Sequence, residues 1–307
     1  MKHSTKLLAA ALLALGLNQA VGADDASDFR QTLQLAEQGV AKAQFNLGLM
    51  YHIGQGVRQD YAEALRWYRQ AAEQGFTSAQ YNLGNMYETG RGVRQDDAEA
   101  FRWYRQAAEQ GYAIAQFNLG NMYLNGQGVR QDYAEAFRWY RQAAEQGNAK
   151  AQHNLGVMYD NGDGVRQDYA EALRWYRKAA EQGYAKAQLN LGMMYANGQG
   201  VRQDNVEALR WYRQAAEQGN AAAQFNLGLM YGKGQGVRQD YAEAFRWYRK
   251  AAEQGNIKAQ FNLGAMYANG HGVRRNFHLS KEWFSKACDS GWQKGCNQYR
   301  YLNQAGD

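Results

Sequence analysis

One motif returns along the chain with a fixed period of 36 residues. The pentapeptide GVRQD begins at Gly56 and returns at Gly92, Gly128, Gly164, Gly200 and Gly236, with an altered copy, GVRRN, at Gly272. An Ala-Gln pair and a tryptophan recur at the same interval. A fixed period of about 20–50 residues is typical of a solenoid, in which each repeat packs against its neighbours. The period therefore constrains the fold before any single motif does.

The first half of each repeat predicts an amphipathic helix. In the repeat from Val40 to Gly75, this helix spans residues 41–52, because apolar residues recur at steps of three and four: Ala43, Leu47, Met50 and Tyr51. Gly48 lies inside the helix and recurs in every copy. Glycine in a helix interior costs up to about 1 kcal/mol. We therefore expect a neighbouring helix to approach closely at this position.

The second half predicts a glycine loop and a second helix. Gly54-Gln55-Gly56 ends the first helix and turns the chain. Asp60 is the expected N-cap of the second helix, and Glu63 stands at the capping-box position. The expected buried stripe comprises Ala64, Trp67, Tyr68, Ala71 and Ala72, and Gly75 ends the helix. The flanking glycines are therefore turn residues, since a phosphate-binding loop would follow a strand and have a different glycine spacing.

The ends of the chain diverge from the repeat. Residues 40–291 form seven full repeats, and residues 24–39 align with a second half-repeat that has lost its tryptophan. Residues 292–307 predict a capping helix, in which Gly295-Cys296 replaces the Ala-Gln pair. Divergent ends suit capping half-repeats, because a terminal repeat presents one face to water. The sequence thus predicts an all-α solenoid of helix-turn-helix repeats, and the complete lack of proline is consistent with it.

Residues 1–23 have the pattern of a secretory signal peptide. Lys2 and Lys6 are followed by an apolar stretch from Leu7 to Leu17, and Val21-Gly22-Ala23 supplies small residues for cleavage near Ala23. The apolar stretch is too short for a membrane span, which needs about 20 residues. We expect a periplasmic or secreted protein with no membrane span.

Charge and motif content argue against several functions. The formal charge of +6 falls to +4 once Lys2 and Lys6 are removed (6 − 2), and charges of both signs alternate, so no nucleic-acid partner is expected. No serine is followed by lysine three positions later, and no HExxH motif is present. We predict no catalytic residues, no metal site and no cofactor. The histidines show no metal-ligand spacing: His3, His52, His153, His271 and His278.

Two cysteines, Cys288 and Cys296, lie near the end in CDSGWQKGC. Export to an oxidising compartment favours a disulfide between them, and a pair of free thiols is the alternative.

The repeat pattern resembles the Sel1-like repeat family. The segment from Ala43 to Gly75 reads AQFNLGLMYHIGQGVRQDYAEALRWYRQAAEQG, and the match covers nearly the whole chain after residue 23. The resemblance implies a right-handed α/α superhelical solenoid related to tetratricopeptide arrays. It also implies a scaffold or adaptor for protein or peptide partners, often in bacterial envelopes or at host contact. We expect a monomer from a Gram-negative bacterium, with an envelope or host protein as its partner.

The C-terminal segment KACDSGWQKGC resembles the helicobacter cysteine-rich proteins. In that family one cysteine ends a second helix and the other lies in the next first helix, which implies that Cys288 ties the seventh repeat to the cap. Some members have been described as binding or hydrolysing β-lactams. The alternative function is therefore an envelope factor that contacts peptidoglycan or β-lactam-like ligands, although here only the last junction carries the cysteines.

The positions that vary between copies predict the binding surface. Residues at 45, 49 and 52 and their equivalents share one helix face, which lines the concave groove in tetratricopeptide-like solenoids. Aromatic residues at the first of these positions have a second interpretation, as core residues between repeats. The predicted partner-binding residues are Tyr81, Asn82, Asn85, Glu88, Phe117, Asn118, Asn121, Leu124, His153, Asn154, Asp160, Asn190 and Met193.

Two sets of polar residues recur in the repeats, one of asparagines and one of arginines. Asn46 and its equivalents either bridge neighbouring repeats or bind a peptide backbone, and the peptide clamp is the preferred interpretation. Arg58, Arg66 and Arg69 are expected to form ion pairs with nearby acids on solvated faces. A basic stripe for an acidic partner is the alternative.

Overall fold

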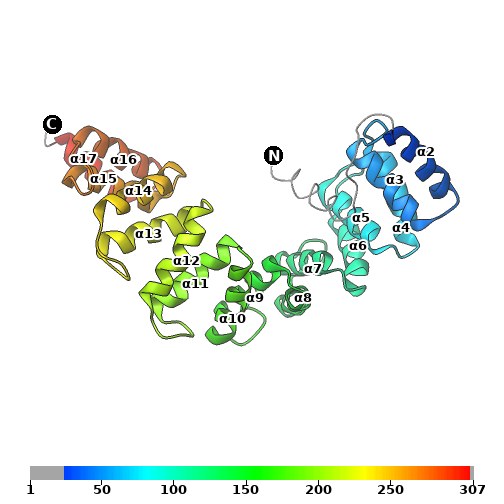
Figure 1. Ribbon diagram of the computed structural model, residues 1–307, viewed down its shortest axis with the longest axis horizontal. Helices are drawn as coiled ribbons and strands as arrows, with labels where there is room; N and C mark the ends of the chain where they lie inside the picture. The colour runs from blue at the N-terminus through cyan, green and yellow to red at the C-terminus, as the bar shows by residue number, and fades with distance from the viewer. Residues whose placement is uncertain (1–23, 305–307) are drawn as a thin grey trace. The chain divides into compact units, whose positions relative to one another are not determined.

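The computed structural model describes residues 24–304, with side chains from Ser27 onward, and this part of the chain is helical throughout, without strands (Figure 1). The first helices of the repeats are α3 (Ala41–Ile53), α5 (Thr77–Thr89), α7 (Ala113–Asn125), α9 (Ala149–Asn161), α11 (Ala185–Asn197), α13 (Ala221–Lys233) and α15 (Ile257–Asn269). The second helices are α4 (Tyr61–Glu73), α6 (Asp97–Glu109), α8 (Tyr133–Glu145), α10 (Tyr169–Glu181), α12 (Asn205–Glu217), α14 (Tyr241–Glu253) and α16 (Phe277–Asp289). Helix α2 (Asp24–Glu37) precedes them, and α17 (Gln293–Gln304) follows.

The chain forms two compact units, an N-terminal unit that ends at Gln131 and a C-terminal unit that begins at Asp132. Within each unit every helix packs against the next one along the chain, from α2 to α7 and from α8 to α17. The predicted all-α solenoid of helix-turn-helix repeats is confirmed. The predicted signal peptide, residues 1–23, lies outside the described residues. No described helix combines the length and apolarity that a membrane crossing requires.

An aspartate caps the second helix, as the sequence predicts, but the capping box does not form. Asp60 Oδ1 accepts hydrogen bonds from the backbone N–H groups of Ala62 and Glu63, at 2.9 and 3.1 Å. The N–H of Asp60 donates to the carbonyl of Tyr51 at 2.9 Å. Because the hairpin brings that carbonyl into reach, the N–H that Glu63 would have satisfied is already taken. Glu63 instead pairs with Arg66 at 2.8 Å.

The glycine loop fixes how one repeat follows another. Gly92 has φ +70°, and a Cβ there would come 2.4 Å from the carbonyl oxygen of Tyr61, at the start of the previous second helix. Only glycine tolerates both the left-handed backbone and this approach. The loop is therefore a packing contact between repeats as well as a turn.

The predicted close approach at Gly48 is confirmed. A Cβ on Gly48 would come 2.7 Å from Cδ1 of Tyr68, whose side chain is fully buried in the second helix of the same hairpin. The constant glycine therefore makes room for the constant tyrosine ring.

The hydrophobic core crosses repeat boundaries. In the N-terminal unit one buried cluster joins Ala71 of α4, Leu83 of α5, Trp103 of α6 and Met122 of α7. The predicted stripe of α4 is buried as expected. A single hairpin therefore cannot complete its own core, which is why such repeats are stable only when stacked.

The buried glutamine of each Ala-Gln pair joins consecutive repeats. Gln80 Nε2 donates to the carbonyl of Ala72, near the end of the preceding helix, at 3.2 Å. Gln110 Nε2 donates in turn to Gln80 Oε1 at 2.7 Å. The sequence analysis used this pair as a marker of the period and assigned it no role.

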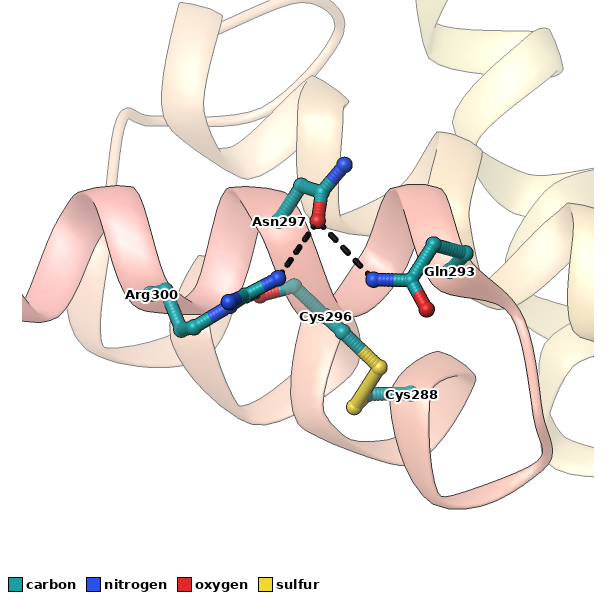
Figure 2. Close-up of a disulfide and its surroundings, with 5 residues drawn as sticks. All are labelled: Cys288, Gln293, Cys296, Asn297 and Arg300. Carbon is teal, nitrogen blue, oxygen red and sulfur yellow. Dashed lines mark hydrogen bonds between the residues drawn. A yellow bond between two sulfur atoms is a disulfide. The ribbon is translucent and has the colours of Figure 1, made fainter.

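The C-terminal end is closed by a disulfide between Cys288 in α16 and Cys296 in α17 (Figure 2). Figure 2 also shows Asn297 Oδ1, which accepts hydrogen bonds from Gln293 Nε2 at 3.0 Å and from Arg300 Nη2 at 2.8 Å. The disulfide joins the last repeat to the final helix, as the resemblance to the cysteine-rich proteins implies.

Candidate partner-binding face

The predicted binding residues lie on the first helices of both units. In the N-terminal unit, α5 and α7 carry Tyr81, Asn82, Asn85, Glu88, Phe117, Asn118, Asn121 and Leu124. In the C-terminal unit, α9 and α11 carry His153, Asn154, Asp160, Asn190 and Met193. We call these two sets the N-terminal face and the C-terminal face. Nearly all of their side chains are half-buried, but His153 is buried and Met193 is exposed.

The aromatic members of the faces pack between hairpins. The ring of Tyr81 lies 5.7 Å from that of Tyr104 in the same repeat and 5.4 Å from that of Tyr112, which precedes the next first helix. His153 makes the same two contacts in the C-terminal unit, with Tyr176 and Tyr184. These contacts are those of core residues that pack between repeats, which was the second interpretation of the aromatic positions. The ring of Tyr81 nevertheless remains partly accessible.

The constant asparagines lie beside constant tyrosines of the preceding repeat. Asn82 lies beside the hydroxyl of Tyr68, which forms no hydrogen bond with the described residues, and it opposes the rise in the tyrosine pKa that burial causes. Asn154 acts in the same way on Tyr140, whose pKa burial raises to about 12. Because Asn82 and Asn154 remain half-buried, their amides keep a surface toward solvent.

A buried tyrosine hydroxyl donates to a carboxylate in each face. Tyr104 Oη donates to Glu88 Oε2 at 2.6 Å in the N-terminal unit. Tyr176 Oη donates to Asp160 Oδ2 at 3.3 Å in the C-terminal unit. Burial raises the pKa of Asp160, and the hydrogen bond from Tyr176 opposes that rise.

His153 joins the polar residues of the C-terminal face into one network. Its Nδ1 lies 3.2 Å from Asn154 Oδ1, and its Nε2 lies 3.3 Å from Asn190 Nδ2. With the amides in these orientations, Nδ1–H donates to Asn154 and the unprotonated Nε2 accepts from Asn190. Burial lowers the pKa of His153, which favours this neutral form. Asn190 also lies beside Tyr176, where it opposes the rise in the tyrosine pKa that burial causes, and Tyr176 in turn donates to Asp160.

Many charged side chains of the second helices pair with a neighbour on the same helix. Arg66 pairs with Glu63 as expected, and its guanidinium also lies 4.6 Å from the ring centroid of Trp67. Arg69 donates to the hydroxyl of Tyr87 instead of pairing with an acid. A recess on the C-terminal unit is likewise formed by charged and aromatic side chains. It is lined by Arg141, Glu145, Tyr159, Glu171, Arg174, Trp175 and Lys178. The cation–π contacts were missed from the sequence, although each arginine directly precedes its tryptophan.

The chain belongs to the Sel1 repeat family. The family matches seven consecutive segments, residues 41–76, 77–112, 113–148, 149–184, 185–220, 221–256 and 257–292. A Sel1-repeat solenoid implies a protein-interaction scaffold, and scaffolds of this family are generally not enzymes. No curated protein matched the chain.

Solved structures of Sel1 repeat proteins are similar to this chain. The protective antigen c5321 of uropathogenic Escherichia coli is 42% identical with a TM-score of 0.87, and the match covers 91% of this chain and 60% of that one. This chain thus spans less than two thirds of c5321. A Sel1 repeat protein from Oxalobacter formigenes is 36% identical with a TM-score of 0.74, over 91% of this chain and 80% of that one. Cysteine rich protein B of Helicobacter pylori is 26% identical with a TM-score of 0.35, over 43% and 94%.

Proposed function

We propose that this chain is an exported scaffold that binds a protein or peptide partner along the first helices of its repeats. The partner is an envelope or host protein, and the scaffold acts as a monomer. The Sel1-repeat fold supports the general role, and the chemistry of the two faces supports the location.

One observation carries the proposal: residues of the first helices that differ between copies remain accessible. Positions equivalent to Leu49 hold Asn85, Asn121, Val157, Met193, Leu229 and Ala265. Every one of these side chains is half-buried or exposed. A surface that recognises a particular partner requires such local differences, whereas the core that surrounds it is nearly constant.

The surface formed by the second helices is a less suitable partner-binding site than the surface of the first helices. Its glutamates and arginines repeat almost unchanged, and they pair with each other at 2.6–2.8 Å in one copy after another. Arginines also cover the tryptophan rings. A partner would have to break these contacts before it could form its own.

Two features support export. The pattern of residues 1–23 is that of a signal peptide. The disulfide between Cys288 and Cys296 is compatible with an extracytoplasmic location, because such bonds persist in oxidising compartments. Mass spectrometry of protein recovered from the periplasm or the medium tests this: we expect a chain that begins at Asp24 with the disulfide formed, and an uncleaved N-terminus would contradict export.

Substitutions on the N-terminal face test the binding role. A random-peptide phage library selected on the purified chain supplies peptide ligands, whose affinity is then measured by calorimetry. We expect Asn85→Arg with Asn121→Arg to weaken binding by about tenfold or more, equivalent to about 1.4 kcal/mol, while thermal unfolding stays nearly unchanged. Glu73→Arg, at an exposed position of α4, is the matched control and should bind normally.

Two results would contradict the proposal. A selection that yields no peptide would argue against peptide binding, and a collapse of thermal unfolding in the Asn85→Arg, Asn121→Arg variant would make these residues structural. Turnover of the β-lactam nitrocefin well above a buffer blank would show that the chain does more than bind.

A further inference from the structure

Acidic side chains are rare on the first helices of the repeats. From α3 to α15 these helices carry only Glu88 and Asp160. Both residues occupy the same position in the repeat, where the other copies have His52, Leu124, Ala196, Gly232 and Ala268. Because the position accepts alanine and glycine, the fold does not require a carboxylate there.

Each of these two carboxylates is held by a buried tyrosine. The hydrogen bonds from Tyr104 to Glu88 and from Tyr176 to Asp160 fix one oxygen of each carboxylate at the helix face. Both tyrosine side chains are at most 1% exposed, so they cannot follow the carboxylates into solvent. A carboxylate has acceptor positions beyond the one that a single hydroxyl uses. The remaining positions of these half-buried groups are available to a ligand.

Neither carboxylate has a cationic partner among the residues that the structure describes. No lysine, arginine or histidine between Ser27 and Gln304 forms an ion pair with Glu88 or Asp160. The glutamates in the first turns of the second helices differ: Glu171, for example, pairs with Arg174 at 2.6 Å. Half-buried anions without counter-charge are unfavourable for the free protein, since burial penalises the charged form.

The surroundings of both carboxylates also favour a cation. Near Glu88, the ring of Tyr104 packs against that of Tyr81, with the two centroids 5.7 Å apart. Near Asp160, Tyr176 lies beside Asn190 and packs against His153, whose pKa burial lowers. The ring of Tyr81 and the amide of Asn190 are only half-buried, and aromatic rings and amide oxygens interact favourably with ammonium and guanidinium groups.

We propose that each face contains a subsite for a lysine or arginine side chain of the peptide partner, formed by Asp160 with Tyr176 in the C-terminal unit and by Glu88 with Tyr104 in the N-terminal unit. The cation supplies the counter-charge that the free protein lacks. This inference rests on the proposed function and adds the chemical class of the residue that is recognised. Each subsite lies wholly within its own unit.

The test uses peptides selected by the full-length chain from a random-peptide phage library. We expect lysine and arginine to be enriched at one or two fixed positions of the selected peptides. For such a peptide, Asp160→Asn or Glu88→Gln should weaken binding about tenfold or more, since hydrogen bonds to charged groups are among the stronger ones. Replacing the peptide lysine by norleucine should have the same effect on the wild-type chain. It should have little further effect on the variant that lacks the matching carboxylate.

Two further variants serve as controls. Glu171→Gln makes the same change of charge on a second helix and should bind like the wild type. Ala196→Asp places a carboxylate at the equivalent position of α11, and we expect it to increase the affinity for peptides that carry an additional lysine. Thermal unfolding of the Asp160→Asn variant should be unchanged or occur at a higher temperature, because an unpaired half-buried charge is removed.

The outcomes separate this inference from the proposed function. Selected peptides without enrichment of lysine or arginine, or equal affinities for wild type, Asp160→Asn and Glu88→Gln, would overturn the cation subsites and leave peptide binding in place. Failure to select any peptide would overturn both.

Discussion

The α-carbon of Gly228 in α13 lies directly against the ring of Tyr248 in α14, and a Cβ on Gly228 would come 2.8 Å from both Cδ1 and Cε1. The same contact joins Gly48 to Tyr68, Gly84 to Tyr104, Gly156 to Tyr176 and Gly192 to Tyr212. It sets how closely the two helices of a hairpin approach.

This contact predicts opposite effects for two alanine substitutions in one helix. Gly228→Ala overpacks the hairpin and should destabilise it by about 1–3 kcal/mol. Gly232→Ala lies one turn further along α13, where the nearest atom to a new Cβ is 3.7 Å away. It should stabilise the helix by up to about 1 kcal/mol, because alanine is the better helix former.

Hydrogen exchange of α13 and α14 measures both variants locally, which matters because long repeat arrays depart from two-state unfolding. Equal protection in the Gly228→Ala and Gly232→Ala variants would show that the tyrosine contact does not limit helix approach.

A second prediction concerns the glutamine that joins repeats. Gln188 Nε2 donates to the carbonyl of Ala180 at 3.1 Å, and Gln188 Oε1 accepts from Gln218 Nε2 at 2.8 Å. Gln188→Met keeps the side-chain size but removes both hydrogen bonds, each worth about 0.5–1.5 kcal/mol net, so it should cost about 1–3 kcal/mol although the Ala180 carbonyl still accepts from the N–H of Gly183 at 2.9 Å. Gln218→Ala, at an exposed position, should cost no more than about 0.5 kcal/mol. If urea unfolding gave the same loss for both variants, the buried hydrogen bond would not be the stabilising contact.

A third prediction concerns the disulfide. Cys288 and Cys296 are only 8 residues apart, so the closed loop is small. Replacing both with serine should cost about 2–3 kcal/mol in the chain-entropy account. Because stability in a repeat array is largely a sum of nearest-neighbour terms, the loss should appear in α16 and α17 and leave α9 unchanged. A uniform loss of exchange protection along the C-terminal unit would contradict that local effect.

A fourth prediction concerns pH. Burial lowers the pKa of His153 below its ordinary value, so the folded state binds fewer protons than the unfolded state near that pKa. Stability should therefore fall as the pH drops below about 6.5, the ordinary histidine value, by at most about 1.4 kcal/mol per pH unit. His153→Phe, which copies Phe117, Phe225 and Phe261, should remove this dependence from α9.

The wild type must be compared with His153→Phe because the pKa shifts of two other groups also make the stability depend on pH. Burial also lowers the pKa of His52, which lies in the N-terminal unit. The raised pKa of Asp160 acts with the opposite sign, since its protonation favours the folded state as the pH falls. Exchange protection of α9 that responds identically to pH in both proteins would exclude His153 as the cause.

Most of the fold was predictable from the sequence because the period fixes which residues face inward. The position of Gly48 predicted close helix approach, and Asp60 predicted the helix start. The failed capping box at Glu63 was not predictable, because the competing acceptor, the carbonyl of Tyr51, becomes a neighbour only when the hairpin closes.

The candidate faces were predictable only in part. Helical periodicity placed Asn85, Glu88 and Asp160 on one side of the first helices, where the structure has their side chains half-buried. Sequence reasoning did not find that buried tyrosines hold the two acids, since Tyr104 and Tyr176 lie 16 residues further along in another helix. It also left open the role of the constant asparagines, whose tyrosine neighbours belong to the preceding repeat.

The most direct test of the account is to locate a bound peptide by photo-crosslinking. A peptide selected by the chain, synthesised with a benzophenone group, is irradiated in complex with the wild-type protein, and the attachment sites are identified by mass spectrometry. We predict attachment to the first helices, at α5 and α7 or at α9 and α11. Attachment mainly to the arginine- and tryptophan-bearing surfaces of the second helices would contradict the account.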